Sequence, residues 1–159
     1  MARGRSRCGC DAPAAEMTKW FDTNYHYLVP ELTADQQFTL SSQRLFDEVR
    51  EAQALGHAVK AVVIGPLTYL WLSKSHGGDF ERLDLIERLL PVYAQVLQQL
   101  ADLGVTWVQV DEPILSLDLP AAWQAAFESA YNRLQTRSIN VLLTTYFGPL
   151  ADNLWLASR

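Results

Sequence analysis

A repeated joint between helix and strand constrains this chain more than any other feature. Leu55-Gly56-His57 precedes the apolar run Val59–Ile64, and Leu103-Gly104-Val105 leads directly into the run Val105–Val110. Both runs are rich in β-branched residues, as buried strands are, and both lead into a turn that contains proline. Glycine suits the left-handed position after a helix. Repeated strand–loop–helix–glycine–strand units predict parallel strands joined by right-handed crossovers, which is an α/β fold.

Helical periodicity accounts for the segments between these strands. We expect a first helix over Ser42–Leu55 and a second over Asp79–Leu103, which Pro91 should kink or split. A third helix should begin at Pro120, since proline is tolerated in the first turn. Its apolar face is formed by Trp123, Phe127, Ala130 and Leu134. Two further extended segments, Met17–Val29 and Asn140–Tyr146, bring the predicted number of strand units to four, and a short amphipathic segment, Leu150–Leu156, follows.

Composition narrows the function classes. A chain of 159 residues fits a single domain, and 49% hydrophobic with 19% charged residues is ordinary globular composition. The net charge of −5 argues against a nucleic-acid partner, because nucleic-acid binders usually present a basic face. The longest apolar run, Ala61–Leu72, is too short to span a bilayer, and Met1–Cys10 has no apolar core typical of a signal peptide. We therefore expect a cytoplasmic protein with no membrane partner.

Cysteine and histidine are too sparse to predict a metal site. Cys8 and Cys10 form one Cys-x-Cys pair, and His26, His57 and His76 are scattered singly. A structural zinc site requires about four Cys or His ligands at characteristic spacing. Walker, dinucleotide and nucleophile-elbow motifs are also absent from the sequence, so we assign no catalytic residue and no metal ligand to this chain.

Four motifs together resemble one enzyme family. They are EMTKWFDTNYHYLVPEL at Glu16–Leu32, GPLTYLWL at Gly65–Leu72, WVQVDEP at Trp107–Pro113 and LLTTYFG at Leu142–Gly148. With these motifs the chain resembles the cobalamin-independent methionine synthases over residues 14–156, in the middle of that family's amino-terminal barrel. The family enzyme is far longer than this chain.

The resemblance implies the fold and the activity of the parent enzyme. The fold would be a partial TIM-type (β/α)8 barrel with about four parallel βα units, in residues 16–159. Residues 1–15 contain small residues, arginine and glycine without hydrophobic periodicity, so from the residues themselves we expect a disordered leader there. The parent enzyme would be a zinc-dependent methyltransferase that makes methionine from homocysteine, with 5-methyltetrahydropteroyltriglutamate as methyl donor. The family's zinc ligands belong to its carboxyl-terminal barrel, so we expect this chain to be inactive alone.

The resemblance assigns a role to one residue, and the end of a predicted strand makes two more residues candidates. The lysine of the EMTKWF stretch, here Lys19, contacts the polyglutamate tail of the folate in that family. Asp111 and Glu112 end a strand, where ligands bind in parallel α/β folds, so they are candidate substrate-binding residues. Neighbouring strand residues point to opposite sides, and only one of the pair can face the barrel interior. A structural or interdomain role is the alternative for this pair.

Two other interpretations remain open at this point. Four strands cannot close such a barrel, and open sheet edges invite pairing, so the chain could be a non-catalytic assembly fragment that folds with its missing half or self-associates. A free-standing enzyme acting on a polycarboxylated ring would require arginines clustered at strand ends. The closely spaced arginines, Arg82 with Arg88 and Arg133 with Arg137, fall instead on or just after helices.

Overall fold

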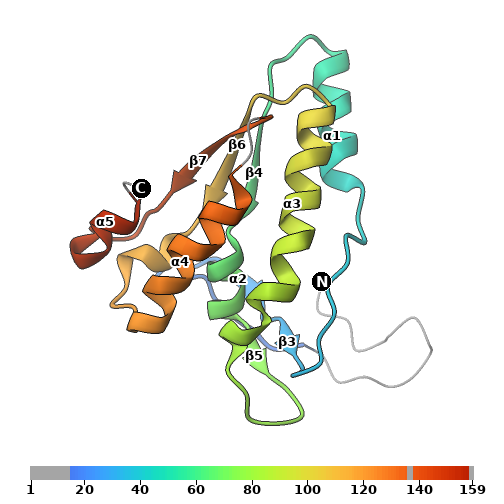
Figure 1. Cartoon of the computed structure of the whole chain (residues 1–159). Coiled ribbons are helices and arrows are strands. Elements are labelled where there is room, and N and C mark those ends of the chain that lie inside the picture. The colour runs from blue at the N-terminus through green and yellow to red at the C-terminus, as the bar shows by residue number, and fades with distance from the viewer. Residues whose placement is uncertain (1–14, 136–137, 158–159) are drawn as a thin grey trace, which may run out of the picture.

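The centre of the fold is a three-stranded parallel sheet in the order β4-β6-β7 (Figure 1). Its strands are β4 (Lys60–Ile64), β6 (Trp107–Asp111) and β7 (Asn140–Thr144). The computed structural model describes residues 15–135 and 138–157. Within these residues the predicted α/β class with parallel strands is confirmed.

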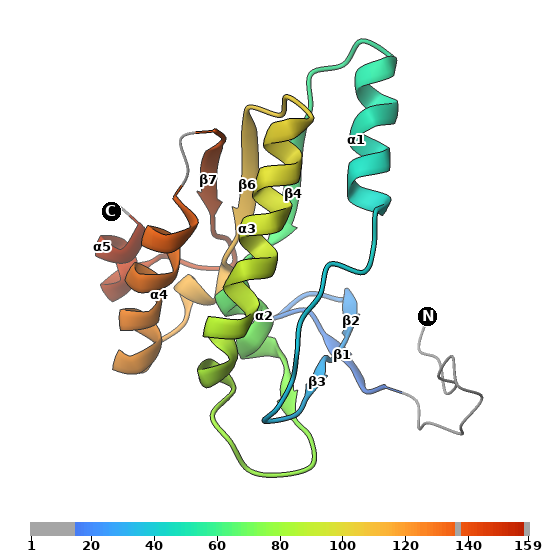
Figure 2. The ribbon, with the colours of Figure 1, turned by 45° about the vertical axis from the view of Figure 1, so that its right-hand side comes forward.

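The two faces of this sheet have different environments. Val108 and Val110 of β6 are buried, and their neighbours across the sheet belong to the same face. Helices α3 (Ile86–Asp102) and α4 (Ala121–Leu134) lie on one side of the sheet (Figure 2), where the buried valines pack. The opposite face keeps its large apolar side chains exposed: Val62 by 50%, Trp107 by 47% and Leu142 by 40%.

Periodicity and glycine positions predicted the long helices well. In α4, all four residues of the predicted apolar face are buried: Trp123, Phe127, Ala130 and Leu134. Helix α1 (Arg44–Ala54) is followed by Gly56 at φ 84°, and α3 by Gly104 at φ 77°, so both glycines end helices as expected. Pro91 lies inside α3, which continues through it. The helix is preceded instead by a separate 3₁₀ turn, η1 (Arg82–Leu85).

The first extended segment was predicted incorrectly. Met17–Val29 is an antiparallel hairpin of β1 (Met17–Lys19) and β2 (His26–Leu28). The turn residues Asp22-Thr23-Asn24 reverse the chain, and the Thr23 hydroxyl donates to the Trp20 carbonyl at 2.6 Å. The hairpin lies outside the main sheet, which therefore has three parallel strands in the described residues rather than four.

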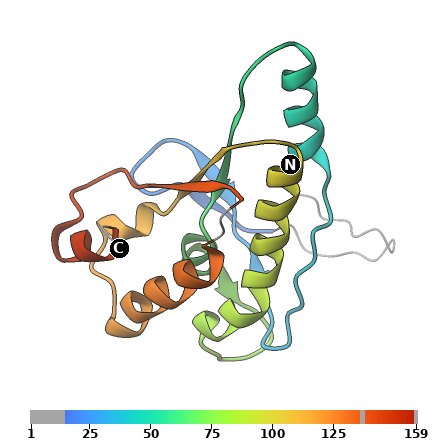
Figure 3. The same ribbon diagram turned by 45° about the horizontal axis from the view of Figure 1, so that its top comes forward.

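The remaining elements are short. They are β3 (Glu31–Leu32) and β5 (Lys74–Ser75), which pair in parallel, helix α2 (Pro66–Leu72), the 3₁₀ turns η2 (Pro113–Ser116) and η3 (Ala151–Asn153), and α5 (Leu154–Ala157). Figure 3 shows α3 and α4 on the same side of the sheet and helix α1 at one end of the molecule. Among the described residues, none of the helices is long and apolar enough to cross a membrane.

Candidate functional site

The carboxyl ends of the three parallel strands meet at one edge of the sheet. Ile64, Asp111 and Thr144 are register partners across β4, β6 and β7. The ladder continues one residue further, because the Gly65 N–H donates to the Asp111 carbonyl at 2.7 Å and the Glu112 N–H to the Thr144 carbonyl at 2.8 Å. This edge is where ligands bind in parallel α/β proteins, so it is the first candidate site.

Glu112 is completely buried, and its carboxylate is bound by groups of the chain itself. The Leu67 N–H donates to Oε1 at 3.1 Å and the Thr68 N–H to Oε2 at 2.7 Å. The Thr68 hydroxyl donates to Oε2 at 2.5 Å, and the Tyr131 hydroxyl to Oε1 at 2.8 Å. Both backbone donors belong to the first turn of α2, whose amides lack helical partners. Glu112 therefore caps α2 and links it to α4.

Burial dominates the ionisation of this cluster. It raises the pKa of Glu112 from its usual 4.5 to about 7, against the opposing effect of the hydrogen bonds from Thr68, Tyr131 and Leu67. Burial and the nearby Glu112 carboxylate also raise the pKa of the Tyr131 hydroxyl well above 10, and the same causes act on Tyr93. These phenols remain protonated donors at neutral pH.

Gly65 makes the close approach of Glu112 possible. A Cβ atom built on Gly65 would lie 2.1 Å from the Glu112 Cδ, which is far inside van der Waals contact. The GPLT turn and the DEP strand end, singled out separately in the sequence, are thus one packed unit. Thr68 lies inside the first turn of α2, which begins at Pro66, and its hydroxyl binds Glu112.

Asp111 lies on the uncovered face of the sheet, in contrast to Glu112. Its carboxylate accepts hydrogen bonds from Gln109 Nε2 at 2.8 Å and from the Tyr146 hydroxyl at 3.4 Å. Lys60 Nζ donates to Gln109 Oε1 at 2.7 Å, so a line of polar contacts crosses this face. Burial, followed by the charge of Asp111, raises the pKa of Tyr146 to about 12. Asp111 is thus the one of the two acidic residues with access to the uncovered face.

Lys19 lies on the β1–β2 hairpin and is exposed. Its ammonium contacts no acidic or polar group, whereas each of the other described lysines and arginines has a polar partner. Lys74, for example, pairs with Glu16 at 2.6 Å. Within residues 15–135 and 138–157, Lys19 is therefore the free cation.

Aromatic packing holds the hairpin against the sheet edge. The rings of Phe21 and Phe147 lie 5.2 Å apart, and Trp20 packs edge-on against Tyr27 at 5.6 Å. The rings of Tyr146 and Phe147 lie 4.6 Å apart. A hydrogen bond from the Trp20 side chain acts on the Tyr146 hydroxyl and lowers its pKa, against the larger effect of burial. The contacts bring the hairpin that carries Lys19 to the strand end that carries Asp111. The sequence contained no signal for this contact.

The other residues considered from sequence are not gathered at this edge. His57 is exposed in the loop before β4, and the His76 Nδ1 lies 3.8 Å from the exposed Glu31 carboxylate. Cys8 and Cys10 fall outside the described residues. In the part of the chain that the structure describes, no three His, Cys, Asp or Glu residues are grouped so that they could hold a metal ion.

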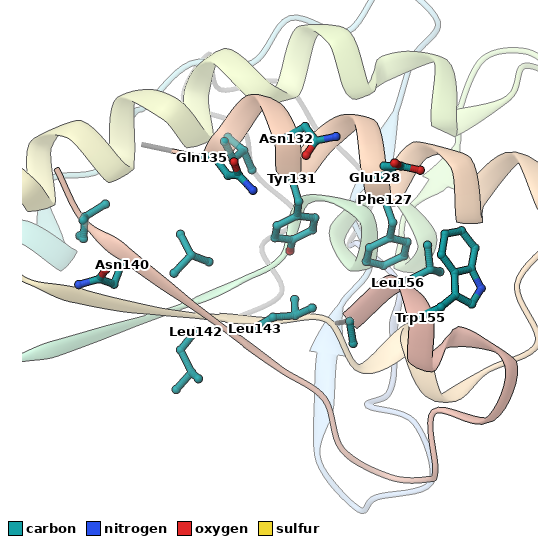
Figure 4. Close-up of a pocket in the computed structure, with 14 residues that line it drawn as sticks. Phe127, Glu128, Tyr131, Asn132, Gln135, Asn140, Leu142, Leu143, Trp155 and Leu156 are labelled. Atoms are coloured by element: carbon teal, nitrogen blue, oxygen red, sulfur yellow. The ribbon is translucent and has the colours of Figure 1, made fainter. Parts of the chain in front are cut away.

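A separate groove of about 590 Å³ lies between α4, β7 and α5 (Figure 4). Its lining is mixed: Phe127, Tyr131, Leu143 and Leu156 contribute apolar surface, and polar side chains contribute a comparable share, namely Glu128, Asn132, Gln135 and Asn140. It borders β7, an outer strand of the sheet. Its described lining contains no lysine, arginine or histidine, so it offers no cationic partner to a polycarboxylate.

Comparison with known proteins adds two findings. Residues 1–158 match the family model described as the amino-terminal domain of cobalamin-independent synthase. The chain is also similar to the crystal structure of a Listeria monocytogenes protein assigned as a vitamin-B12 independent methionine synthase, with 19% identity and a TM-score of 0.59. The match covers 78% of this chain and 44% of that one, so the chain spans less than half of the length of the solved structure.

Proposed function

Since the chain belongs to the cobalamin-independent methionine synthase family, within its amino-terminal domain, we propose that it serves methyl transfer to homocysteine from 5-methyltetrahydropteroyltriglutamate. The product is methionine, and the parent enzyme is a methyltransferase of amino-acid biosynthesis acting in the cytoplasm. The part of this chain is to supply scaffold and a contact for the folate tail. Its sheet, covered by helices on one face, would be one portion of a (β/α)8 barrel.

The chemistry of methyl transfer is assigned to another part of the parent enzyme. Transfer to sulfur requires a thiolate, which zinc would supply by binding homocysteine. The described residues do not fit a zinc site, because no three His, Cys, Asp or Glu side chains among them are grouped to hold a metal ion. We therefore expect the purified chain to show no turnover. Zinc-dependent formation of methionine by the chain alone would contradict this assignment.

Lys19 is the residue proposed to bind the tail. The observation that supports this role is that the Lys19 ammonium is exposed and has no polar partner among the described residues, whereas the Lys74 ammonium already pairs with Glu16. An ammonium is a point-charge partner for carboxylates. Asp111 is proposed as a weaker, polar contact at the same edge, whereas the buried Glu112 is proposed to hold the scaffold of the site.

Titration with a folate triglutamate tests the role of Lys19. Lys19→Ala should weaken binding about fivefold, as expected for the loss of a solvent-exposed ion pair of roughly 1 kcal/mol. Lys60→Ala is the matched control, since it removes the same charge from the opposite end of the sheet, where Lys60 contacts only Gln109 among polar groups described. Equal binding by the natural chain and Lys19→Ala would remove the proposed tail contact.

A second candidate function is that of a non-catalytic assembly piece. The exposed row of Val62, Trp107 and Leu142 favours it, because both faces of a parallel sheet are normally covered. Mixing the chain with the remainder of the family enzyme should then protect Trp107 from solvent, as measured by a blue shift of the tryptophan fluorescence that is smaller when Trp107→Phe is mixed instead. An unchanged spectrum would argue against this role.

A further inference from the structure

The register of the hairpin places one particular side chain beside Lys19. His26 is its direct partner across the β1–β2 ladder. Hydrogen-bonded pairs flank this position, since the Trp20 N–H donates to the Tyr25 carbonyl at 2.7 Å and the Val29 N–H to the Glu16 carbonyl at 2.8 Å. Because the two pair types alternate, Lys19 and His26 form a non-hydrogen-bonded pair. In such a pair the Cβ atoms lie about 4.5–5.5 Å apart, on the same face.

Both side chains of this pair are available to a ligand. Lys19 and His26 are exposed, and the side chain of neither has a polar partner among the described residues. The opposite face of the hairpin carries Tyr27, whose hydroxyl donates to the Leu72 carbonyl at 3.1 Å. The charges that affect the pKa of the Tyr27 hydroxyl are those of Lys74, Glu16 and Arg82, and Glu16 pairs with Lys74 at 2.6 Å.

The hairpin that presents the pair is held in place by its own contacts. The Thr23 hydroxyl closes the turn onto the Trp20 carbonyl, and the ring of Phe21 packs on Phe147 beyond β7. The backbone that carries these two donors is therefore held before a ligand binds. Binding would cost little in ordering of the backbone. Lysine supplies three N–H donors, and an imidazole supplies one or two according to its protonation.

We infer that Lys19 and His26 together form one binding site for neighbouring carboxylates of an oligoglutamate chain. The inference rests on the proposed function, because it names a second residue at the same contact. Lys19 supplies a point charge to one carboxylate, and His26 donates an N–H to the next carboxylate along the tail. The affinity for a ligand with several glutamates should therefore depend on His26 more than the affinity for a ligand with a single glutamate does.

The experiment compares variants of the whole chain in titrations with folate triglutamate and folate monoglutamate. His26→Gln should weaken triglutamate binding about two- to fivefold, as expected for one exposed contact, and should affect the monoglutamate less. His26→Lys should bind the triglutamate at least as tightly as the natural chain. His57→Gln is the matched control, because His57 is exposed in the loop before β4, and it should leave binding unchanged.

The outcomes separate this inference from the proposed function. If Lys19→Ala weakens binding and His26→Gln does not, the two-residue site is wrong and the tail contact through Lys19 stands. If neither variant changes binding, or the natural chain binds no triglutamate, both fail. Far-ultraviolet circular dichroism of each variant checks the fold, and a loss with His26→Gln that His26→Lys does not restore would also overturn the inference.

Discussion

The buried carboxyl of Glu112 gives this protein a titrating group near neutral pH. Its pKa in the folded chain is about 7, against a usual value of 4.5, because burial outweighs the hydrogen bonds. The folded state therefore holds a proton that the unfolded state releases between these two values. It follows that the free energy of unfolding should fall as the pH rises from about 4.5 through about 7, by up to roughly 3 kcal/mol.

Glu112→Gln tests this residue. The amide cannot ionise, so the fall in unfolding free energy between pH 5 and pH 8 should become shallower in urea titrations. The variant should also be less stable than the natural chain at pH 5, because its NH₂ group would face donors from Leu67 or Thr68. The exposed Glu48→Gln serves as control and should keep the natural slope. An unchanged slope in Glu112→Gln would show that another group causes the dependence.

The sequence identified individual site residues but not the side chains that contact them. Lys19, Asp111 and Glu112 were all candidates from their motifs. The alternation along a strand agrees with the structure, in which Asp111 lies on the uncovered face and Glu112 is buried, whereas which of them faces a barrel interior stays a prediction. That Thr68 and Tyr131 would bind Glu112 could not be predicted. Their contact depends on how α2 and α4 pack on the sheet, over separations of 44 and 19 residues, and local patterns carry no such information.

The junction between β4 and α2 gives a prediction at the scale of elements. Gly65 has an ordinary φ of −72°, so alanine there suffers no backbone strain, but its Cβ would lie 2.1 Å from Glu112 Cδ. Gly65→Ala should therefore lower the free energy of unfolding by roughly 2 kcal/mol through overpacking alone. Gly78→Ala is the matched control, because its Cβ would meet no atom within 4 Å.

A double-mutant cycle isolates the cause. In a Glu112→Ala background the clash partner is absent, so Gly65→Ala should cost less than in the natural chain, as measured by chemical denaturation. Equal costs in both backgrounds would show that Glu112 is not what restricts residue 65.

The helices that the sequence predicted well and those that it missed differ in length. The long helices α3 and α4 have enough turns for their apolar spacing to appear, and α1 and α3 end at glycines in the left-handed region. Helix α2 has seven residues and is apolar around most of its circumference, so its sequence shows no helical period and gave no bounds for a helix there. The hairpin was missed because its aromatic strands flank a turn of only a few residues.

One face of the sheet determines whether the isolated chain associates with other copies. The parallel strands were predictable from the repeated glycine joints, whereas the number of strands was not, because one extended segment pairs with itself instead of with the sheet. Val62, Gln109 and Leu142 are register partners, and the two apolar members of this row are half-exposed. Closure of a full barrel stays a prediction of the family resemblance.

We expect the isolated chain to self-associate through this face and the free edge of β7. Burying apolar side chains on association contributes about 25 cal/mol for each Å² removed from water, and an open strand edge supplies unpaired backbone groups. Leu142→Lys places a charge on that face and edge, which should raise the concentration needed for association about tenfold or more in sedimentation equilibrium. Leu55→Lys, at a leucine that is 71% exposed beyond the end of α1, should leave association unchanged. The natural chain could instead stay monomeric and unfold in one sharp transition that does not depend on concentration. That result would mean that the isolated chain is stable with this face of the sheet exposed to solvent. In that case neither a second copy nor a further half of a barrel would be needed to cover it.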